Sequence, residues 1–290
     1  MPKIAYIAKN FRYESLRIIA QATEIADEYD AQGFSLTLRQ LYYQFVARGL
    51  LANNQKSYDR LGSIINDARL AGLFDWDMIE DRTRNVRNVA TWDNGADILK
   101  SAANQFRLDP WKDQDCLVEC WIEKDALLGV IERTCRDLRI PYYACRGYNS
   151  QSEQWRASVR AIESGKRVVI LHLGDHDPSG LDMTRDIEDR FRTFHADEVE
   201  VRRLALNFDQ VEEYSPPPNP AKMTDSRAGE YVARYGSESW ELDALSPPVI
   251  DALIRAAVEP LLDQDAWDAT LAREDEERER IVDFAERFTE

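Results

Sequence analysis

Residues 168–183 read VVILHLGDHDPSGLDM, an apolar run that changes abruptly into acids, a proline and a glycine. The apolar half is typical of a buried strand, and Asp, Pro, Ser and Gly are residues that turns use. A turn therefore explains the second half. However, Asp175 and Asp177 also place two carboxylates one residue apart, and hard cations such as Mg²⁺ bind where carboxylate oxygens converge. The stretch predicts either a simple turn or part of a divalent-metal site.

Strands and helices alternate on both sides of this stretch. Strands are predicted at 116–123, 141–146, 167–173 and 199–206, and helices at 124–138, 152–165 and 179–194. This alternation is typical of an α/β fold, in which helices cover a mostly parallel sheet. In such sheets the functional groups gather at the carboxyl ends of the strands. Acids at those ends are therefore candidates for a site.

Glu123 provides such an acid, because it ends the first predicted strand in the segment WIEKDA. The first and third strands of a βαβαβ unit can lie side by side, which would bring Glu123 to Asp175 and Asp177. Three carboxylates in one pocket would need a cation to offset their repulsion. The alternative is that Glu123 caps the following helix while the two aspartates only form a turn.

The N-terminal part is predicted to be helical, at 14–31, 37–49 and 57–72. Thr37 and Gln40 have the spacing of a capping box, and Ser57 is the expected cap of the third helix. Residues 73–92 then mix β-formers with arginines and lack a helical period. Three helices followed by a basic extended segment predict a winged helix-turn-helix module.

The chain divides into three predicted units: a winged-helix domain at 1–108, a metal-binding α/β domain at 109–207 and a helical extension at 208–290. One more helix is expected at 95–107. Residues 212–225 are rich in proline and predict a loop, followed by helices at 227–235 and 247–287. Residues 271–290 are strongly acidic, and we expect them to form a solvated face or a partner contact.

Composition indicates a soluble globular protein. The chain has 290 residues, 44% of them hydrophobic and 31% charged, with no apolar run that would cross a bilayer. The N-terminus lacks the features of a signal peptide, so a cytoplasmic location without membrane contact is expected. The four cysteines lack the CxxC spacing of a zinc site, so we expect them to be small buried side chains.

The formal net charge is −16, but it is unevenly distributed. Residues 1–110 hold 14 basic and 14 acidic side chains, whereas residues 111–290 hold 23 basic and 39 acidic ones. Within residues 31–70 the balance is positive. Local patches decide whether a surface meets phosphate, so this segment is a candidate for DNA contact, with Arg60 and Arg69 among its cations.

The two acidic segments, WIEKDA and GDHDPSGLDM, together resemble the Toprim domain of the A subunit of type IIB topoisomerases and of the related meiotic transesterases that make double-strand breaks. The resemblance implies that Glu123, Asp175 and Asp177 hold Mg²⁺, with Asp182 a weaker further acid. His176 departs from the family pattern, and we interpret it as a bystander. The resemblance covers about residues 30–206.

The same resemblance implies a tyrosine nucleophile in the upstream helical module. TLRQLYYQF at 37–45 matches this segment, with Tyr43 as the attacking residue and Arg39 as its arginine. Taken alone, such a cluster of aromatics would normally be core packing. In the resembled family the tyrosine and the metal of one active site come from different subunits, so a homodimer acting on double-stranded DNA is implied. Lys124 and Arg146 are further candidates for phosphate contact.

Three functions are compatible with these patterns. The first is a Mg²⁺-dependent DNA transesterase that forms a 5′-phosphotyrosyl intermediate. Since the sequence contains no nucleotide-binding loop, coupled strand passage would require a separate ATPase subunit of the B type. The second is a Toprim nuclease that uses metal-activated water, with Tyr43 merely structural. The third is a non-catalytic winged-helix protein that binds DNA, which the acidic total charge favours slightly.

Overall fold

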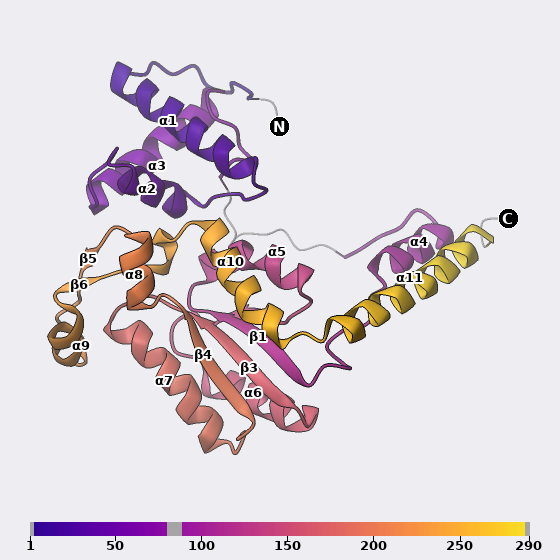
Figure 1. Ribbon diagram of the computed structural model, residues 1–290. Helices are drawn as coiled ribbons and strands as arrows, with labels where there is room; N and C mark the ends of the chain where they lie inside the picture. The colour runs from indigo at the N-terminus through magenta and orange to yellow at the C-terminus, as the bar shows by residue number, and fades with distance from the viewer. Residues whose placement is uncertain (1–2, 80–88, 288–290) are drawn as a thin grey trace.

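The computed structural model describes residues 3–79 and 89–287. A unit of three helices lies above a sheet covered by helices on both faces, and a long C-terminal helix projects to one side (Figure 1). The three upper helices are α1 (Tyr13–Asp30), α2 (Leu38–Ala47) and α3 (Gln55–Leu70). Within the described residues, no helix combines the length and apolarity needed to cross a membrane.

The three N-terminal helices were predicted, and their ends follow from local sequence signals. The capping box of α2 is present, because Thr37 and Gln40 each bond the other's backbone N–H. The predicted cap of α3 is wrong: the side chain of Asn54 accepts from Ser57 N at 2.9 Å, so the helix starts earlier. The helices pack around a core that includes Ile19, Phe45 and Ile65.

The predicted wing lies partly outside the described residues, because residues 80–88 are not among them. In the described parts of that segment, 73–79 and 89–92, the only pairing is a single parallel bridge between Leu36 and Ile79. The helix α4 (Gly95–Gln105) was predicted as part of the first domain. Instead it lies along the projecting C-terminal helix α11 (Gln264–Arg287), away from α1 to α3 (Figure 1).

The sheet has four parallel strands in the order β2-β1-β3-β4. These are β1 (Cys116–Ile122), β2 (Tyr142–Ala144), β3 (Arg167–Leu173) and β4 (Val199–Ala205), which confirms the predicted α/β class. On one face, Trp121 and Ile170 pack against α6 (Gln151–Ser164) and α7 (Pro178–Thr193). On the other, Val118 and Leu171 pack with α5 (Leu128–Asp137) and α10 (Pro247–Val258).

The C-terminal segment completes this core rather than extending from it. Ile250 and Ile254 of α10 are fully buried in the same cluster as the strands, so residues beyond 207 belong to the fold of the sheet domain. The four cysteines are buried free thiols, as expected. The predicted proline-rich loop begins within the end of α8 (Phe208–Tyr214) and then contains β5 (Asn219–Pro220). This strand pairs with β6 (Glu238–Ser239), which follows α9 (Ala228–Tyr235).

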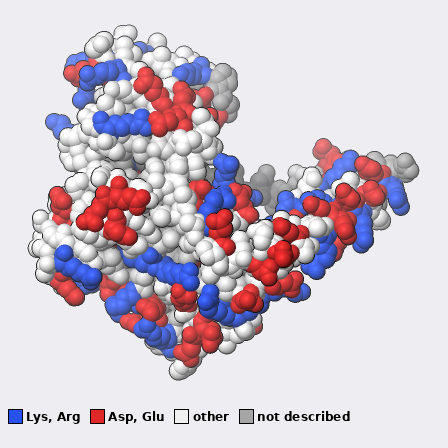
Figure 2. Space-filling view, in the orientation of Figure 1, with Lys and Arg blue, Asp and Glu red and all other residues white. Residues whose placement is uncertain are grey.

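The acidic helix α11 is only partly a solvated face. Acidic and basic side chains are interspersed along the projecting arm that it forms with α4 (Figure 2). Glu274, however, is buried and forms ion pairs with Arg139, Arg278 and Arg107. Hydrogen bonds from Arg139, and its charge, lower the pKa of this carboxyl to about 2. Glu274 therefore ties the arm to the end of α5.

Candidate functional site

The carboxyl ends of β1 and β3 meet at one point. Glu123 N donates to the carbonyl of Leu173 at 2.8 Å, and the carboxylate of Glu123 accepts from Asp175 N, also at 2.8 Å. The predicted proximity of Glu123 to the aspartate segment is thus confirmed. Burial raises the pKa of Glu123, and the nearby charge of Asp177 adds to this effect.

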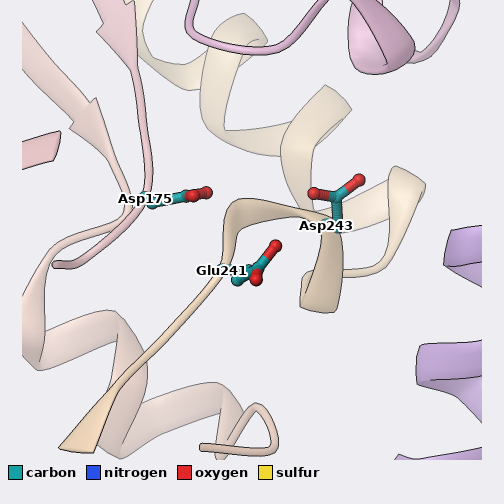
Figure 3. Close-up of side chains that lie close together, drawn as sticks. All are labelled: Asp175, Glu241 and Asp243. Carbon is teal, nitrogen blue, oxygen red and sulfur yellow. The ribbon is translucent and has the colours of Figure 1, made fainter. Parts of the chain in front are cut away.

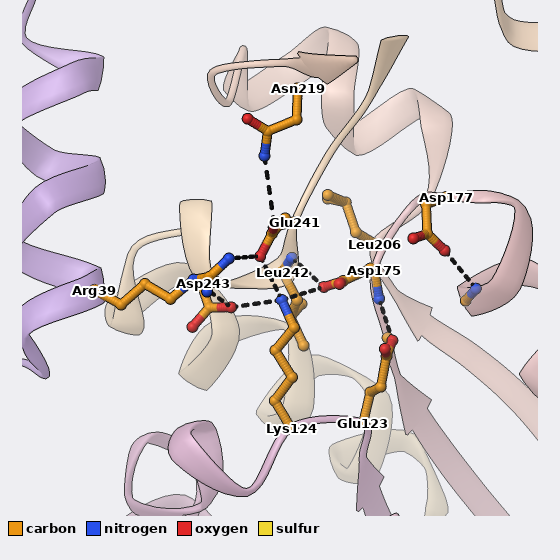
Figure 4. A network of polar contacts seen from close by, with 12 residues as sticks. Arg39, Glu123, Lys124, Asp175, Asp177, Leu206, Asn219, Glu241, Leu242 and Asp243 are labelled. Atoms are coloured by element: carbon orange, nitrogen blue, oxygen red, sulfur yellow. Dashed lines mark hydrogen bonds and ion pairs between the residues drawn. The ribbon is translucent and has the colours of Figure 1, made fainter. Parts of the chain in front are cut away.

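The two aspartates of the opening stretch have different surroundings. Asp177 caps α7, since its Oδ1 accepts from Gly180 N at 2.6 Å and from Ser179 Oγ at 2.9 Å. Gly180 is required at this turn, because a Cβ there would lie 2.2 Å from the carbonyl oxygen of Asp175. Asp175 points the other way, towards the C-terminal segment (Figure 4). The stretch therefore forms a turn and also contributes an acid to a cluster.

Partly buried Arg203 of β4 holds this turn from behind. Its guanidinium donates to the carbonyl oxygens of Asp175 at 2.6 Å, Gly180 at 2.8 Å and Gly174 at 3.1 Å. Burial lowers the pKa of Arg203 to about 10, despite the neighbouring acids. Because its donors are used by backbone carbonyls, Arg203 fixes the position of the turn and leaves the carboxylate of Asp175 free to face the cleft.

The acids that converge are Asp175, Glu241 and Asp243, whose oxygens lie within 4.8 Å of one another (Figure 3). Hereafter they are called the acidic cluster. Glu241 and Asp243 flank the start of the 3₁₀ turn Leu242–Ala244. Leu242 N donates to Asp175 Oδ1 at 2.8 Å, and His176 and Trp240 exchange two backbone hydrogen bonds of 2.8 and 3.0 Å. These bonds fix the segment of Glu241 and Asp243 against the turn of Asp175.

The cluster differs from the predicted ligand set. The carboxylates of Glu123 and Asp177 lie next to it, but each is already engaged by backbone N–H groups, as described above. Sequence reasoning missed Glu241 and Asp243, although SWELDAL repeats the acid-x-acid spacing of Asp175 and Asp177. Asp182, the weaker predicted acid, lies outside the cluster and pairs with Arg185 and Arg227.

A lysine amine occupies the centre of the acidic cluster. Lys124 Nζ lies 2.9 Å from Asp175 Oδ1, 2.7 Å from Glu241 Oε2 and 2.6 Å from Asp243 Oδ2 (Figure 4). Burial disfavours the charged form of Lys124 and acts to lower its pKa. The attraction of the three carboxylates outweighs this effect, so the pKa of Lys124 lies above its usual value. Burial raises the pKa of Asp175 to about 7, although the Lys124 ammonium acts against this shift.

The donor set fits a hard divalent cation. The cluster offers carboxylate oxygens, which Mg²⁺ prefers. In addition, Asp243 is buried and its second oxygen, Oδ1, has no hydrogen-bond partner among the described residues. A buried carboxylate oxygen without a partner is costly, and coordination to a cation would satisfy it. The chain thus contains a buried acidic triad that could bind a metal ion.

The acidic cluster opens into a cleft of about 380 Å³ between the helical unit and the sheet domain. Asp175, Asp177 and Glu241 line one side of it. The rest of the lining comes from α2, the start of α3 and the strand β5. It includes Arg39, Tyr43, Asn54, Tyr58 and Asn219. Residues predicted from two separate motifs therefore face one shared space.

Tyr43 lies in this cleft and is connected to the acidic cluster by one side chain. Asn219 Nδ2 is 3.3 Å from the Tyr43 hydroxyl and 3.4 Å from Glu241 Oε1. Tyr43 is only 3% exposed, and burial raises its pKa, with the charge of Glu241 adding to the effect. The phenol is therefore protonated in this state. The resemblance implied that tyrosine and metal ligands come from different subunits, whereas here both line a cleft of the same chain.

Arg39 and Tyr42 have separate roles around Tyr43. The Arg39 guanidinium lies 5.8 Å from the centre of the Tyr43 ring and pairs with Glu241, and more loosely with Asp243 at 3.7 Å. Arg39 thus joins α2 to the acidic cluster. The hydroxyl of Tyr42 accepts from Asn54 N at 2.8 Å, so this neighbour of Tyr43 is engaged in holding the loop before α3.

The residues predicted to contact DNA are all engaged within the chain. Arg60 pairs with Glu14, and Arg146 pairs with Asp125 at 3.1 Å. Arg69 donates to the carbonyl oxygens of Trp76 and Ile79, and its guanidinium lies 5.4 Å from the Trp76 ring centre. Lys124 lies in the acidic cluster rather than on an open basic surface. Positive and negative side chains are mixed over the face seen in Figure 2, which shows no continuous basic stripe.

No protein-family model matches this chain, and a search of curated proteins finds no match. The resemblance to the type IIB topoisomerase A subunit therefore depends on the motifs quoted above.

Proposed function

We propose that this protein is a Mg²⁺-dependent DNA transesterase in which Tyr43 is the nucleophile. The observation that carries the proposal is that Tyr43 lines one cleft with Asp175 and Glu241 of the acidic cluster, and that the Asn219 amide contacts both Tyr43 and Glu241. A phosphodiester in this cleft would meet a phenol on one side and a cation-binding site on the other. That combination suits phosphoryl transfer, which depends mainly on positioning and charge stabilisation.

The reaction is a transesterification. The Tyr43 oxygen attacks phosphorus, the bond from phosphorus to the 3′ oxygen breaks, and a 5′-phosphotyrosyl end and a 3′-hydroxyl result. The phenol must lose its proton, because a neutral tyrosine hydroxyl is a weak nucleophile. The proton would pass to solvent water in the cleft, and the neighbouring charge of Arg39 would favour the phenolate. The leaving 3′ oxygen would take up a proton from solvent.

The cation would be held by the acidic cluster. Glu123 and Asp177 would fix the turn of Asp175 through their hydrogen bonds to backbone N–H groups. When bound, Mg²⁺ would polarise a phosphoryl oxygen and neutralise charge that develops during transfer. Arg39 is placed next to both the phenol and the carboxylates, so its charge would stabilise the phosphate and lower the pKa of Tyr43 towards deprotonation.

Two copies of the chain would be needed to cut both strands of a duplex, so the proposal includes a homodimer. Coupled strand passage would further require a separate ATPase subunit. The net charge of −16 implies weak non-specific affinity for DNA. We therefore expect DNA binding to depend mainly on contacts in the cleft and on its cation, with a shallow dependence on salt concentration.

A cleavage assay tests the proposal. The protein is incubated with supercoiled plasmid and MgCl₂ and denatured with detergent, and DNA ends are examined for attached protein. We expect attachment at 5′ ends, its loss in Tyr43→Phe, and its retention in Tyr58→Phe, which removes another hydroxyl of the same cleft. Free ends that persist in Tyr43→Phe but vanish in Asp175→Asn would instead identify a metal-dependent nuclease. DNA binding without any cleavage would identify a non-catalytic DNA-binding protein.

A further inference from the structure

The Lys124 ammonium is held where a cation ligated by the acidic cluster would lie. The ammonium lies 2.6, 2.7 and 2.9 Å from three carboxylates, and these are the same three carboxylates that form the candidate metal site (Figure 4). The ammonium donates hydrogen bonds to Glu241 and Asp243 and forms an ion pair with Asp175, so each acid of the cluster contacts it. Lys124 therefore acts as an internal counter-ion of the acidic cluster.

A divalent cation and this ammonium compete for the same oxygens. Mg²⁺ binds its oxygen ligands at about 2.1 Å, closer than an ammonium does. Two cations that share three ligand atoms within 4.8 Å would also repel each other strongly in a partly buried site. Occupation of the cluster by the metal thus requires that the lysine amine leave it.

The surroundings of Lys124 allow that movement. Its side chain is 23% exposed, and its ammonium sits at the end of a flexible four-carbon stem. The side chain of Asp243, in contrast, is fully buried on the 3₁₀ turn. The unpartnered Oδ1 of Asp243 indicates further coordinating capacity that the lysine does not use. Arg39, which pairs with Glu241 from the other side, would remain to balance charge.

We propose that Lys124 is a resident cation that is exchanged for the divalent metal, so that metal loading and release of the lysine amine are one event. The proposal rests on the proposed function in assigning the cluster to Mg²⁺. It also adds a form of control. Without the metal, the cluster is neutralised and closed by the lysine. With the metal, the freed ammonium lies beside the cleft, where it is available to the phosphate of DNA.

The first test measures metal affinity without DNA. Mn²⁺ serves as the probe, and the free ion is quantified by electron paramagnetic resonance for the wild type, Lys124→Met and Lys222→Met. Lys222 lines the same cleft outside the cluster, so its variant corrects for the general loss of one positive charge. We expect Lys124→Met to bind Mn²⁺ about tenfold more tightly or better, and Lys222→Met to differ from wild type by about twofold at most. Equal or weaker binding by Lys124→Met would overturn the exchange.

A second test uses the wild-type protein alone, in case Lys124→Met does not fold. Lysines are acylated with a small succinimidyl ester, with and without saturating MgCl₂, and labelling is quantified by peptide mass spectrometry. We expect Mg²⁺ to raise the labelling rate of Lys124 severalfold and to leave Lys222 unchanged. An unchanged rate at Lys124, or an absence of metal binding, would refute the proposal. Neither test contains DNA, so the exchange can be confirmed even if the protein does not cleave DNA. That combination of results would contradict the proposed transesterase activity but not the exchange of Lys124 for the metal.

Discussion

The backbone amide of Asp175 donates a hydrogen bond of 2.8 Å to the carboxylate of Glu123, across 52 positions of sequence. This bond exists because β1 and β3 are parallel neighbours in register, so that Ile122 lies opposite Leu173 and both chains leave the sheet together. The bond places Glu123 beside the turn that carries Asp175. The remaining acids of the site, Glu241 and Asp243, come from a segment that docks onto this turn.

Removing a carboxylate of the acidic cluster should weaken metal binding. We expect Glu241→Gln and Asp243→Asn each to lower Mg²⁺ affinity by about tenfold or more, because each deletes a charged oxygen ligand. Affinity is measured by Mn²⁺ titration and Mg²⁺ competition. The control is Glu238→Gln, an exposed acid three positions before Glu241. A loss of the same size in all three variants would show a general charge effect and would contradict specific coordination.

The position of Tyr43 predicts that each chain contains a complete site. Mixed samples of Tyr43→Phe and Asp175→Asn proteins should therefore form no protein–DNA adducts, because every chain lacks one essential part. If tyrosine and acids came from different subunits, mixed dimers would contain one intact site, and adducts would reappear. Recovery of adduct formation on mixing would thus contradict the arrangement within one chain and support the one implied by the family resemblance.

The buried His172 should make folding sensitive to acid. Burial lowers its pKa from 6.5 to about 3, and nearby Arg203 adds to this effect. The Thr184 hydroxyl, which accepts from Arg203 at 2.9 Å, lies 2.8 Å from His172 Nδ1 and can donate to that nitrogen in the neutral ring. Since the unfolded chain gains a proton below pH 6.5 and the folded chain does not, stability is full above that pH. It is lost as pH falls from 6.5 towards 3.

At about pH 5 this linkage corresponds to about 2 kcal/mol of lost unfolding free energy. In His172→Asn, which keeps an acceptor for Thr184, the decrease in stability between about pH 7.5 and pH 5 should shrink by about that amount. Urea denaturation at the two pH values measures it. His195→Asn is the control, since His195 is exposed and has a positive φ of 58°, which asparagine tolerates. An unchanged pH dependence in His172→Asn would contradict a neutral buried His172.

Glu274 should be essential to the stability of the α4–α11 arm. Replacing it with glutamine leaves Arg139 and Arg278 without their buried partner, so we expect a loss of about 3 kcal/mol in unfolding free energy. Glu276→Gln, at an exposed position of the same helix, should change stability by less than about 0.5 kcal/mol. Both values come from urea denaturation at neutral pH. Equal stability of the two variants would contradict a structural role for Glu274.

Much of the sheet domain was predictable because its strands are short apolar runs whose ends are marked by acids or turn residues. The neighbourhood of Glu123 and Asp175 followed from the behaviour of parallel strands. The start of α3 was not predictable, because Asn54 and Ser57 are both good caps and only the surrounding loop decides between them.

Two of the three acids of the acidic cluster could not be placed from sequence pattern alone. Glu241 and Asp243 lie in a region of prolines and short elements without periodicity, and their position depends on backbone bonds between Trp240 and His176. Glu274 was expected to be solvated because its neighbours in sequence are charged. Its burial depends on Arg139, which is 135 positions away. Long-range pairing of this kind leaves no local signal.

The central claim is that Tyr43 attacks DNA within the cleft of the acidic cluster. The most direct measurement is to trap the protein–DNA adduct formed with Mg²⁺, digest both components, and locate the nucleotide-bearing peptide by mass spectrometry. The account predicts a 5′-phosphate linked to Tyr43, in the peptide that also contains Tyr42. Attachment to a different residue, attachment through a 3′-phosphate, or cleavage with no covalent product would contradict it.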